Sequence, residues 1–150
     1  MLKEGQKAPE FELQADDGST VRLADLRGKK VLLFFYPRAD TPGCTIEACE
    51  FRDLEAEFAA KGALVFGISP DPVKDVGRFR SKFNLSYPLL ADADHQVAER
   101  YGVWKEKSMF GKKYWGVERS TFVIDEQGEI AGAHYGVSPE GHAAEMLAAL

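Results

Sequence analysis

The sequence contains two side chains that can act as strong nucleophiles, Cys44 and Cys49, and they are its only cysteines. They stand five residues apart in the segment Pro37–Cys49, "PRADTPGCTIEAC", and the first follows directly after Thr-Pro-Gly. Two cysteines are too few for the disulfide scaffold of a small secreted protein. A close pair therefore indicates metal binding or thiol redox chemistry.

The residues before Cys44 predict the start of a helix. Thr41 is a natural N-cap, and Pro42 is then the first helical residue. Cys44 falls in the first turn, which carries unpaired backbone N–H groups and the positive end of the helix dipole. These surroundings stabilise a thiolate, which is the nucleophilic form of cysteine.

Helix geometry also determines how the two cysteines relate to each other. At 100° per residue, Cys44 shares the expected core face with Ala48 and Phe51, whereas Cys49 lies about 140° away on the wetter side. Ile46 breaks this pattern, because it is apolar and lies on the outer side. Five helical residues separate the two Cα atoms by roughly 8.7 Å, and a disulfide needs less than about 7 Å. The cysteines can therefore pair only if the first turns unwind.

Continuous apolar runs predict three strands that are buried on both faces, at residues 31–36, 63–69 and 120–125. The turn-like "EQG" that follows the third run predicts a hairpin partner at 129–136. The first run ends directly before the cysteine segment.

Helical patterns lie between these strands. Asp71 and Pro72 predict an N-cap and a first helical residue, and Ser138 and Pro139 open the final helix in the same way. The pattern at residues 92–102 predicts a short helix that ends in glycine. The expected core-facing residues of the two longer helices are Val76, Phe79, Phe83, Met146, Leu147 and Leu150.

Strands that alternate with helices predict an α/β fold with a central mixed sheet flanked by helices. The length of 150 residues favours one domain spanning 1–150. In such folds active residues gather where the carboxyl end of a strand meets a helix N-terminus, which is where the cysteine segment stands.

Composition excludes several classes of function. The net charge of −5 makes nucleic acid and anionic membranes poor partners. No apolar run approaches the roughly 18 to 20 residues of a membrane span. The N-terminus has no apolar segment of a secretory signal, so a cytoplasmic location is expected.

Three other features have weaker functional interpretations. The segment 104–116, "WKEKSMFGKKYWG", is basic with interleaved aromatics, as in some nucleic-acid sites. A solvated loop or hairpin that walls the active site fits the segment better, because it leads directly to Arg119. His95, His134 and His142 are scattered and offer no zinc-ligand spacing, so no metal is expected. The "GKK" at 28–30 lacks the rest of a phosphate-binding loop.

Taken together, the motifs resemble those of a known family. Pro37, Thr41 and Cys44 form the Pro-x-x-x-Thr-x-x-Cys pattern of peroxiredoxins. "FFYPRADTPGCTIEACEFRD" is similar to the Q-type branch, also called bacterioferritin comigratory proteins. The resemblance extends over nearly the whole chain, through "GISPD", "Q-VAERYGVW" and "ERSTFVID".

The resemblance implies a thioredoxin-like fold and the reduction of hydroperoxides without a metal or flavin cofactor. Cys44 matches the peroxidatic cysteine, which attacks the peroxide and becomes a sulfenic acid. Thr41 matches the residue whose hydroxyl orients the peroxide, and Pro37 matches the proline that shields the site.

The resemblance also assigns three supporting roles. Arg119 matches the arginine that supports the thiolate, and Glu47 matches a glutamate that commonly orients this arginine. Cys49 matches the resolving cysteine found in the same helix in one Q-type subgroup, which forms an intramolecular disulfide after local unwinding. The chain lacks the C-terminal resolving cysteine of the obligate-dimer subgroup, so no intersubunit disulfide of that type is expected. The Q-type branch contains many monomers, so the resemblance implies a monomer. Thioredoxin is the expected reductant.

Two alternative functions remain open on the sequence. A general thiol–disulfide oxidoreductase would use the same fold, but it would carry a Cys-x-x-Cys pair, which this chain lacks. A peroxide sensor or redox-switched binding protein would use the same cysteines and would expose a binding surface when the helix unwinds.

Overall fold

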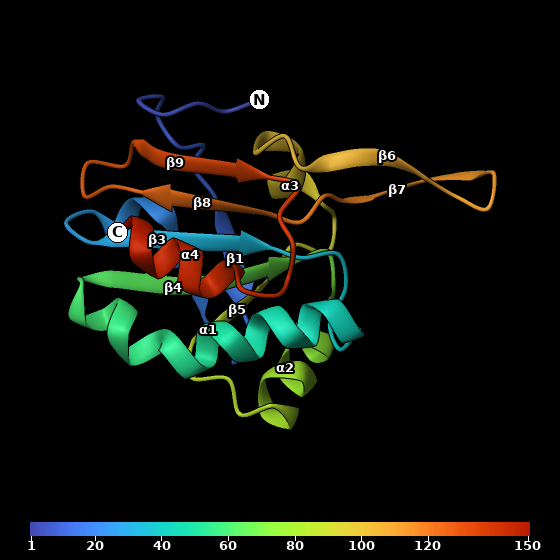
Figure 1. Cartoon of the computed structure of the whole chain (residues 1–150), viewed down its shortest axis with the longest axis horizontal. Coiled ribbons are helices and arrows are strands. Elements are labelled where there is room, and N and C mark those ends of the chain that lie inside the picture. Colours follow the sequence, from blue (N-terminus) through green and yellow to red (C-terminus); the bar gives the residue numbers. More distant parts are fainter.

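The computed structural model describes residues 1–150 and has a seven-stranded mixed sheet at its centre (Figure 1). The strand order is β2-β1-β5-β4-β3-β8-β9. Strands β3, β4 and β5 are parallel, and the other neighbours pair antiparallel. The strands span Glu12–Ala15 (β1), Thr20–Arg22 (β2), Lys30–Phe35 (β3), Ala63–Ser69 (β4), Leu89–Ala91 (β5), Ser120–Ile124 (β8) and Ile130–Tyr135 (β9).

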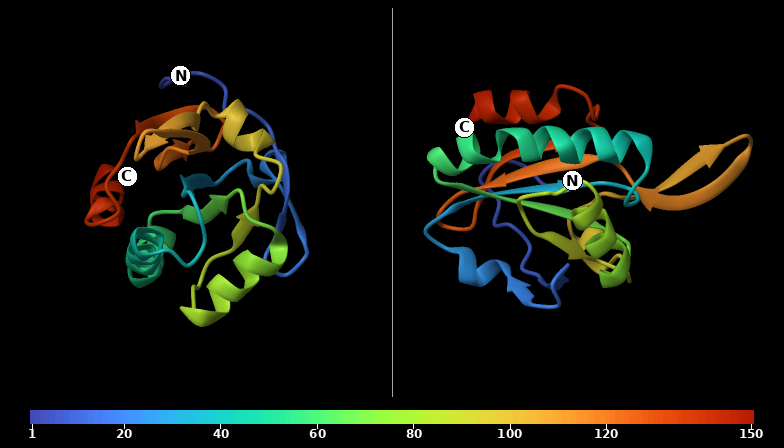
Figure 2. Two further views of the ribbon diagram at one scale, coloured as in Figure 1. Left: turned by 90° about the vertical axis from the view of Figure 1, so that its right-hand side faces the viewer. Right: turned by 90° about the horizontal axis from the view of Figure 1, so that it is seen from below.

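The helices cover both faces of this sheet. Helices α1 and α4 lie together on one side, as both views of Figure 2 show, and α1 also packs on β4. Helix α2 packs on β5 and shares the hydrophobic cluster of α1 and α4, whereas α3 and η1 belong to the cluster on the other face. The helices span Pro42–Ala60 (α1), Val73–Lys82 (α2), Gln96–Arg100 (α3) and His142–Ala149 (α4), with a 3-10 helix at Leu23–Leu26 (η1).

Strand β3 separates two hydrophobic cores. Its side chains alternate across the sheet, so that Leu33 and Phe35 join one cluster with α3 and η1, whereas Leu32 and Phe34 join the other. The second cluster also contains Cys44 and the inner faces of α1, α2 and α4. A strand buried on both faces explains the continuous apolar run in the sequence.

The predicted strands at 31–36, 63–69 and 120–125 are confirmed as β3, β4 and β8, and the hairpin partner of β8 is β9. The short helix within 92–102 is α3. Strands β1, β2 and β5 were not predicted from the sequence, because each has only three or four residues. The expected core residues Val76, Phe79 and Met146 are buried.

Two predicted helix starts are wrong. Helix α2 begins at Val73 rather than at Pro72, and the Asp71 carboxylate accepts a hydrogen bond from the Ala39 N–H (2.8 Å) instead of capping the helix. Helix α4 begins at His142 rather than at Pro139. Gly141 has a φ of +77°, and this left-handed conformation prevents a continuous helix from Pro139.

Residues 104–116, expected as a loop or hairpin, form a hairpin of Trp104–Met109 (β6) and Lys112–Val117 (β7). This two-stranded ribbon extends beyond the end of the main sheet (Figure 1).

The packing of β4 against β3 and β5 predicts that Gly67→Ala destabilises the protein. A Cβ at Gly67 would lie 2.8 Å from both Leu89 Cδ2 and Phe34 Cζ in a filled core. We expect a loss of about 1–3 kcal/mol in the free energy of unfolding, measured with urea. Gly116→Ala is the matched control, because its nearest neighbour atoms would be 3.6 Å away. Equal stabilities of the two variants would contradict this packing.

Candidate active site at the start of helix α1

Both cysteines lie in helix α1, which continues without a break from Pro42 to Ala60. Cys44 is in the first turn and is 1% exposed, within the second hydrophobic cluster. Cys49 is half-buried, and both thiols are free. Cys49 is more exposed than Cys44, as predicted, and Cys44 is fully buried on the predicted core face.

Arg119 connects Cys44 to a second buried group. The residue lies between β7 and β8, and its side chain is 15% exposed. Its Nη2 donates a hydrogen bond to Cys44 Sγ at 3.4 Å, and its Nη1 donates to Glu47 Oε1 at 2.8 Å. One guanidinium group therefore holds both a sulfur and a carboxylate of the same helix.

Burial shapes the electrostatics of this cluster. Burial raises the pKa of Glu47 from 4.5 to about 7, while the charge and hydrogen bond of Arg119 oppose the shift. Burial also opposes the charge on Arg119, but the Glu47 carboxylate and the Cys44 sulfur outweigh it and raise the pKa of the guanidinium. The positive charge on Arg119 is therefore permanent, and it lies against the Cys44 sulfur.

The loop between β3 and α1 carries the remaining predicted residues. Thr41 is the N-cap of α1, as predicted, but its hydroxyl donates to the Arg38 carbonyl (2.9 Å) and caps no helix N–H. Pro37 is half-buried and follows the end of β3. Asp71 anchors the loop through Ala39, as described above.

Gly43 is a site residue that the sequence analysis did not single out. A Cβ at this position would lie 3.3 Å from Arg119 Nη2. The glycine therefore leaves room for the guanidinium beside the first turn. The glycine in Thr-Pro-Gly-Cys was visible in the sequence, but its reason is a contact with a residue 76 positions away.

This arrangement is suited to thiolate chemistry. A fixed cation and the first turn of a helix both favour negative charge on the Cys44 sulfur. The same donors can stabilise charge that develops on an oxygen bound near that sulfur.

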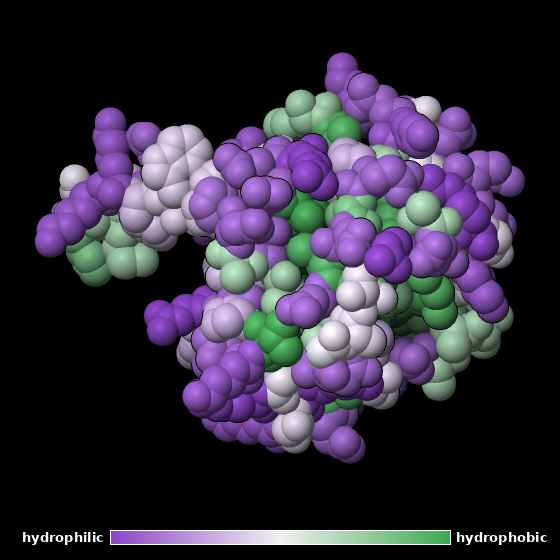
Figure 3. All heavy atoms as spheres, turned by 180° about the vertical axis from the view of Figure 1, so that it is seen from behind, coloured by the Kyte–Doolittle hydropathy of each residue, from purple (hydrophilic) through white to green (hydrophobic).

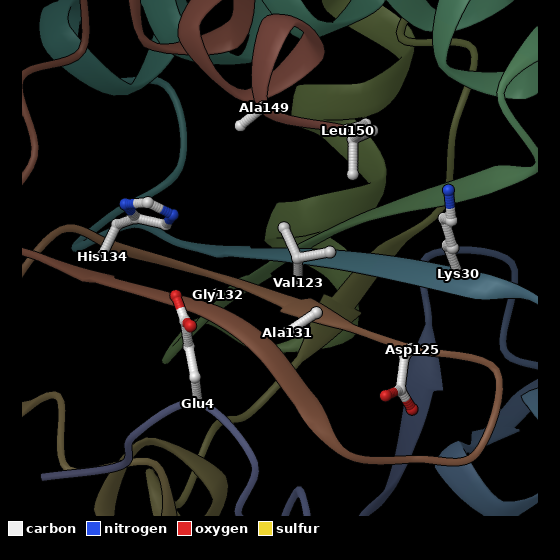
Figure 4. A pocket seen from close by; sticks show the side chains of 9 residues that line it. All are labelled: Glu4, Lys30, Val123, Asp125, Ala131, Gly132, His134, Ala149 and Leu150. Carbon is white, nitrogen blue, oxygen red and sulfur yellow. The ribbon is translucent and has the colours of Figure 1, made fainter.

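A cavity of about 290 Å³ lies elsewhere, between the C-terminal end of α4 and strands β8 and β9 (Figure 4). None of the predicted site residues lines it. The structure has no group of three or more His, Cys, Asp or Glu side chains placed to hold a metal ion. None of its helices combines the length and the apolar character that crossing a membrane requires.

Comparisons with known proteins identify the family of this chain. Residues 4–133 match the AhpC/TSA family. The chain is 49% identical over 146 residues to peroxiredoxin Bcp of Bacillus subtilis, covering 97% of this chain and 93% of the relative. It is also 49% identical over 129 residues to peroxiredoxin Bcp of Escherichia coli, covering 86% and 83% of the two chains.

A solved structure of a related protein has the same fold. The Xanthomonas campestris bacterioferritin comigratory protein, described for its alkyl peroxide reduction activity, superposes with a TM-score of 0.92 at 34% identity. The match covers 98% of this chain and 96% of that one. The chain therefore belongs to the AhpC/TSA family and, within it, to the peroxiredoxins of the Bcp or Q type. The thioredoxin-like fold and the peroxidase class expected from the sequence are confirmed.

The raised pKa of Glu47 predicts a pH dependence of stability. The folded protein binds this proton more tightly than the unfolded chain does. The protonated Glu47 therefore adds to the free energy of unfolding in full below pH 4.5, and this addition is lost as the pH rises to about 7. Relative to Glu47→Gln, wild type should lose about 3 kcal/mol of unfolding free energy over this range, measured by urea titrations at several pH values.

Glu57→Gln, an exposed position on the same helix, provides the control and should follow wild type at every pH. A constant difference between wild type and Glu47→Gln would show that Glu47 is ionised throughout the range.

Proposed function

We propose that this protein is a two-cysteine peroxidase that reduces hydrogen peroxide and organic hydroperoxides through Cys44. One observation carries the proposal: Arg119 Nη2 lies 3.4 Å from the buried Cys44 sulfur. A cationic donor at this distance supports a thiolate, and no other cysteine of the chain has such a partner.

In the first step the Cys44 thiolate attacks the terminal oxygen of the peroxide. The O–O bond breaks, the leaving oxygen takes up a proton and departs as water or an alcohol, and the sulfur becomes a sulfenic acid. The sulfur is oxidised by two electrons and the peroxide is reduced by two. Arg119 and Thr41 are the proposed donors to the two oxygens, Glu47 orients Arg119, and Pro37 shields the sulfur from water.

In the second step Cys49 attacks the sulfenic sulfur, a disulfide forms, and water leaves. This step requires the first turns of α1 to unwind, because the intact helix keeps the cysteines too far apart. Two contacts oppose this unwinding. The Tyr87 hydroxyl donates to the Ala48 carbonyl at 2.6 Å, and Arg52 Nη1 donates to the Phe83 carbonyl at 2.7 Å. The segment 83–87 therefore holds the part of α1 that carries Cys49.

In the third step an external dithiol, proposed to be thioredoxin, reduces the disulfide by exchange and restores both thiols. We propose that the chain acts as a single-domain monomer in the cytoplasm. The two hydrophobic clusters, which meet at β3, support the assignment of one domain.

The cysteine roles predict distinct products after one equivalent of hydrogen peroxide is added to the reduced protein. Wild type should lose two hydrogens by intact mass. Cys49→Ser should stop at a Cys44 sulfenic acid that a dimedone-type reagent traps, and Cys44→Ser should not react rapidly. Wild type that accumulates sulfenic or higher acids would remove Cys49 from the cycle. Slow oxidation of every form would favour a sensor over a peroxidase.

The contact between Tyr87 and Ala48 predicts that Tyr87→Phe speeds disulfide formation. The substitution keeps the ring packing and removes one hydrogen bond, worth about 1 kcal/mol, that holds the folded helix. The unwound fraction should rise about five-fold, and the share of sulfinic acid formed at high peroxide should fall by a similar factor, measured by mass spectrometry.

Tyr101→Phe is the matched control, because the Tyr101 hydroxyl also donates to a carbonyl, that of Pro9 (2.8 Å), but in the other core. If both variants change the product ratio equally, global stability rather than the Tyr87 contact controls unwinding.

A further inference from the structure

Two features of the sequence have no role in the peroxide chemistry described above: the basic aromatic segment 104–116 and the outward-facing Ile46. Both features contain large apolar side chains that are exposed to solvent. Four of the six exposed large apolar side chains lie close together in the β6–β7 hairpin, and Ile46 is another. Those in the hairpin are Met109 (55% exposed), Phe110 (97%), Tyr114 (42%) and Trp115 (58%).

The hairpin and the start of α1 occupy the same end of the molecule (Figures 1 and 2). In the space-filling view the hairpin stands clear of the body, and apolar atoms lie near its far end among hydrophilic ones (Figure 3). A projecting, apolar ribbon beside a redox-active thiol is suited to contact a macromolecule, because isolated proteins rarely leave such a surface exposed without a function.

The two faces of the hairpin differ in their surroundings. Lys107 and Tyr114 are paired across the strands and share one face with Lys112. This face is on the active-site side, because the Lys107 ammonium donates to the carbonyl of Val117, two residues before Arg119. Burial and then the charge of Arg119 lower the pKa of Lys107, while Glu118 and the Cys44 sulfur oppose the shift. We call the side chains of Lys105, Lys107, Met109, Lys112 and Tyr114 the inner face.

The opposite face points away from the active site. Its Trp104 stacks on His95 with ring centroids 4.0 Å apart, and Trp115 lies on the same face. Together with Glu99, these residues line a shallow groove of about 380 Å³. We call the side chains of Trp104, Glu106, Ser108, Lys113 and Trp115 the outer face.

Charge indicates what kind of partner the inner face accepts. The hairpin contains four lysines and one glutamate, for a net charge of +3, so the rest of the chain carries −8 of the total of −5. Three of the four lysines lie on the inner face, and none of them forms an ion pair. The inner face is therefore complementary to a partner surface that has acidic residues around an apolar centre.

We propose that the inner face of the β6–β7 hairpin is the docking surface for an acidic dithiol protein that reduces the Cys44–Cys49 disulfide. This inference rests on the proposed two-cysteine cycle. Strand β7 ends two residues before Arg119, which contacts Cys44, so a donor bound along the inner face lies next to the cysteine site.

The exchange transfers two electrons. A thiolate of the donor attacks one sulfur of the Cys44–Cys49 disulfide and releases the other cysteine as a thiolate. The second thiol of the donor loses its proton and attacks the mixed disulfide. The donor leaves as a disulfide, and both cysteines of this chain are free.

The test compares two double variants that change neighbouring positions on opposite faces. Lys112→Glu/Tyr114→Ala alters the inner face, and Lys113→Glu/Trp115→Ala alters the outer face by the same chemistry. Turnover of hydrogen peroxide is measured with Escherichia coli thioredoxin, its reductase and NADPH, at varied thioredoxin concentration and two salt concentrations.

We expect the inner-face variant to lower kcat/KM for thioredoxin at least five-fold and to weaken its salt dependence. The outer-face variant should stay within two-fold of wild type. Both variants should match wild type in single-turnover oxidation by hydrogen peroxide and in turnover with dithiothreitol, because neither measurement involves docking.

Equal effects of the two variants, or no effect of either, would overturn the proposed surface. If dithiothreitol recycles wild type but thioredoxin does not, the donor class is wrong and the disulfide cycle stands. If wild type forms no disulfide, the proposed function fails instead. A wild-type dimer that the inner-face variant abolishes, seen by sedimentation, would assign this face to a second copy of the chain.

Discussion

The guanidinium of Arg119 is the contact on which the site depends. It bonds to Cys44 and to Glu47, which lie three residues apart on α1, and it arrives from the junction between the hairpin and the main sheet. Burial disfavours the anionic form of the Glu47 carboxyl group, and the charge and hydrogen bond of Arg119 partly offset this cost. The cation in turn is fixed beside the sulfur because the carboxylate holds its other nitrogen. Gly43 leaves the space that Arg119 Nη2 occupies beside the first turn.

The same helix is subject to opposing requirements. Cys44, Ala48 and Phe51 are buried against the sheet, and Phe51 stacks on Phe34 with ring centroids 4.6 Å apart. This packing fixes the sulfur beside Arg119. The proposed disulfide requires the opposite, a helix start that opens. The short segment 83–87 bears on both requirements. It packs in the same hydrophobic cluster as α1, and two hydrogen bonds, from Tyr87 to the Ala48 carbonyl and from Arg52 to the Phe83 carbonyl, hold the part of the helix that carries Cys49.

The parts of the fold that could be predicted are those whose signal is local. Strands β3, β4 and β8 are continuous apolar runs, and Thr41-Pro42 marks the start of α1. The analogous Asp71-Pro72 does not cap α2, because the Asp71 carboxylate accepts a hydrogen bond from a distant loop, which no local pattern shows. The pairing of Glu47 with Arg119 spans 72 positions, and only the family resemblance indicated it.

The deep burial of Cys44 has a thermodynamic consequence. The side chain is 1% exposed in a core packed around a bare sulfur. Oxidation adds an oxygen to that sulfur, so the side chain becomes bulkier and more polar than the thiol that fills this place in the core. Linkage makes this effect reciprocal: if oxidation of Cys44 lowers the stability of the folded helix, then folding of the helix disfavours oxidation of Cys44 by the same free energy. The oxidised sulfur and the closed helix are thus competing states, so that the chemical change itself shifts the helix toward opening.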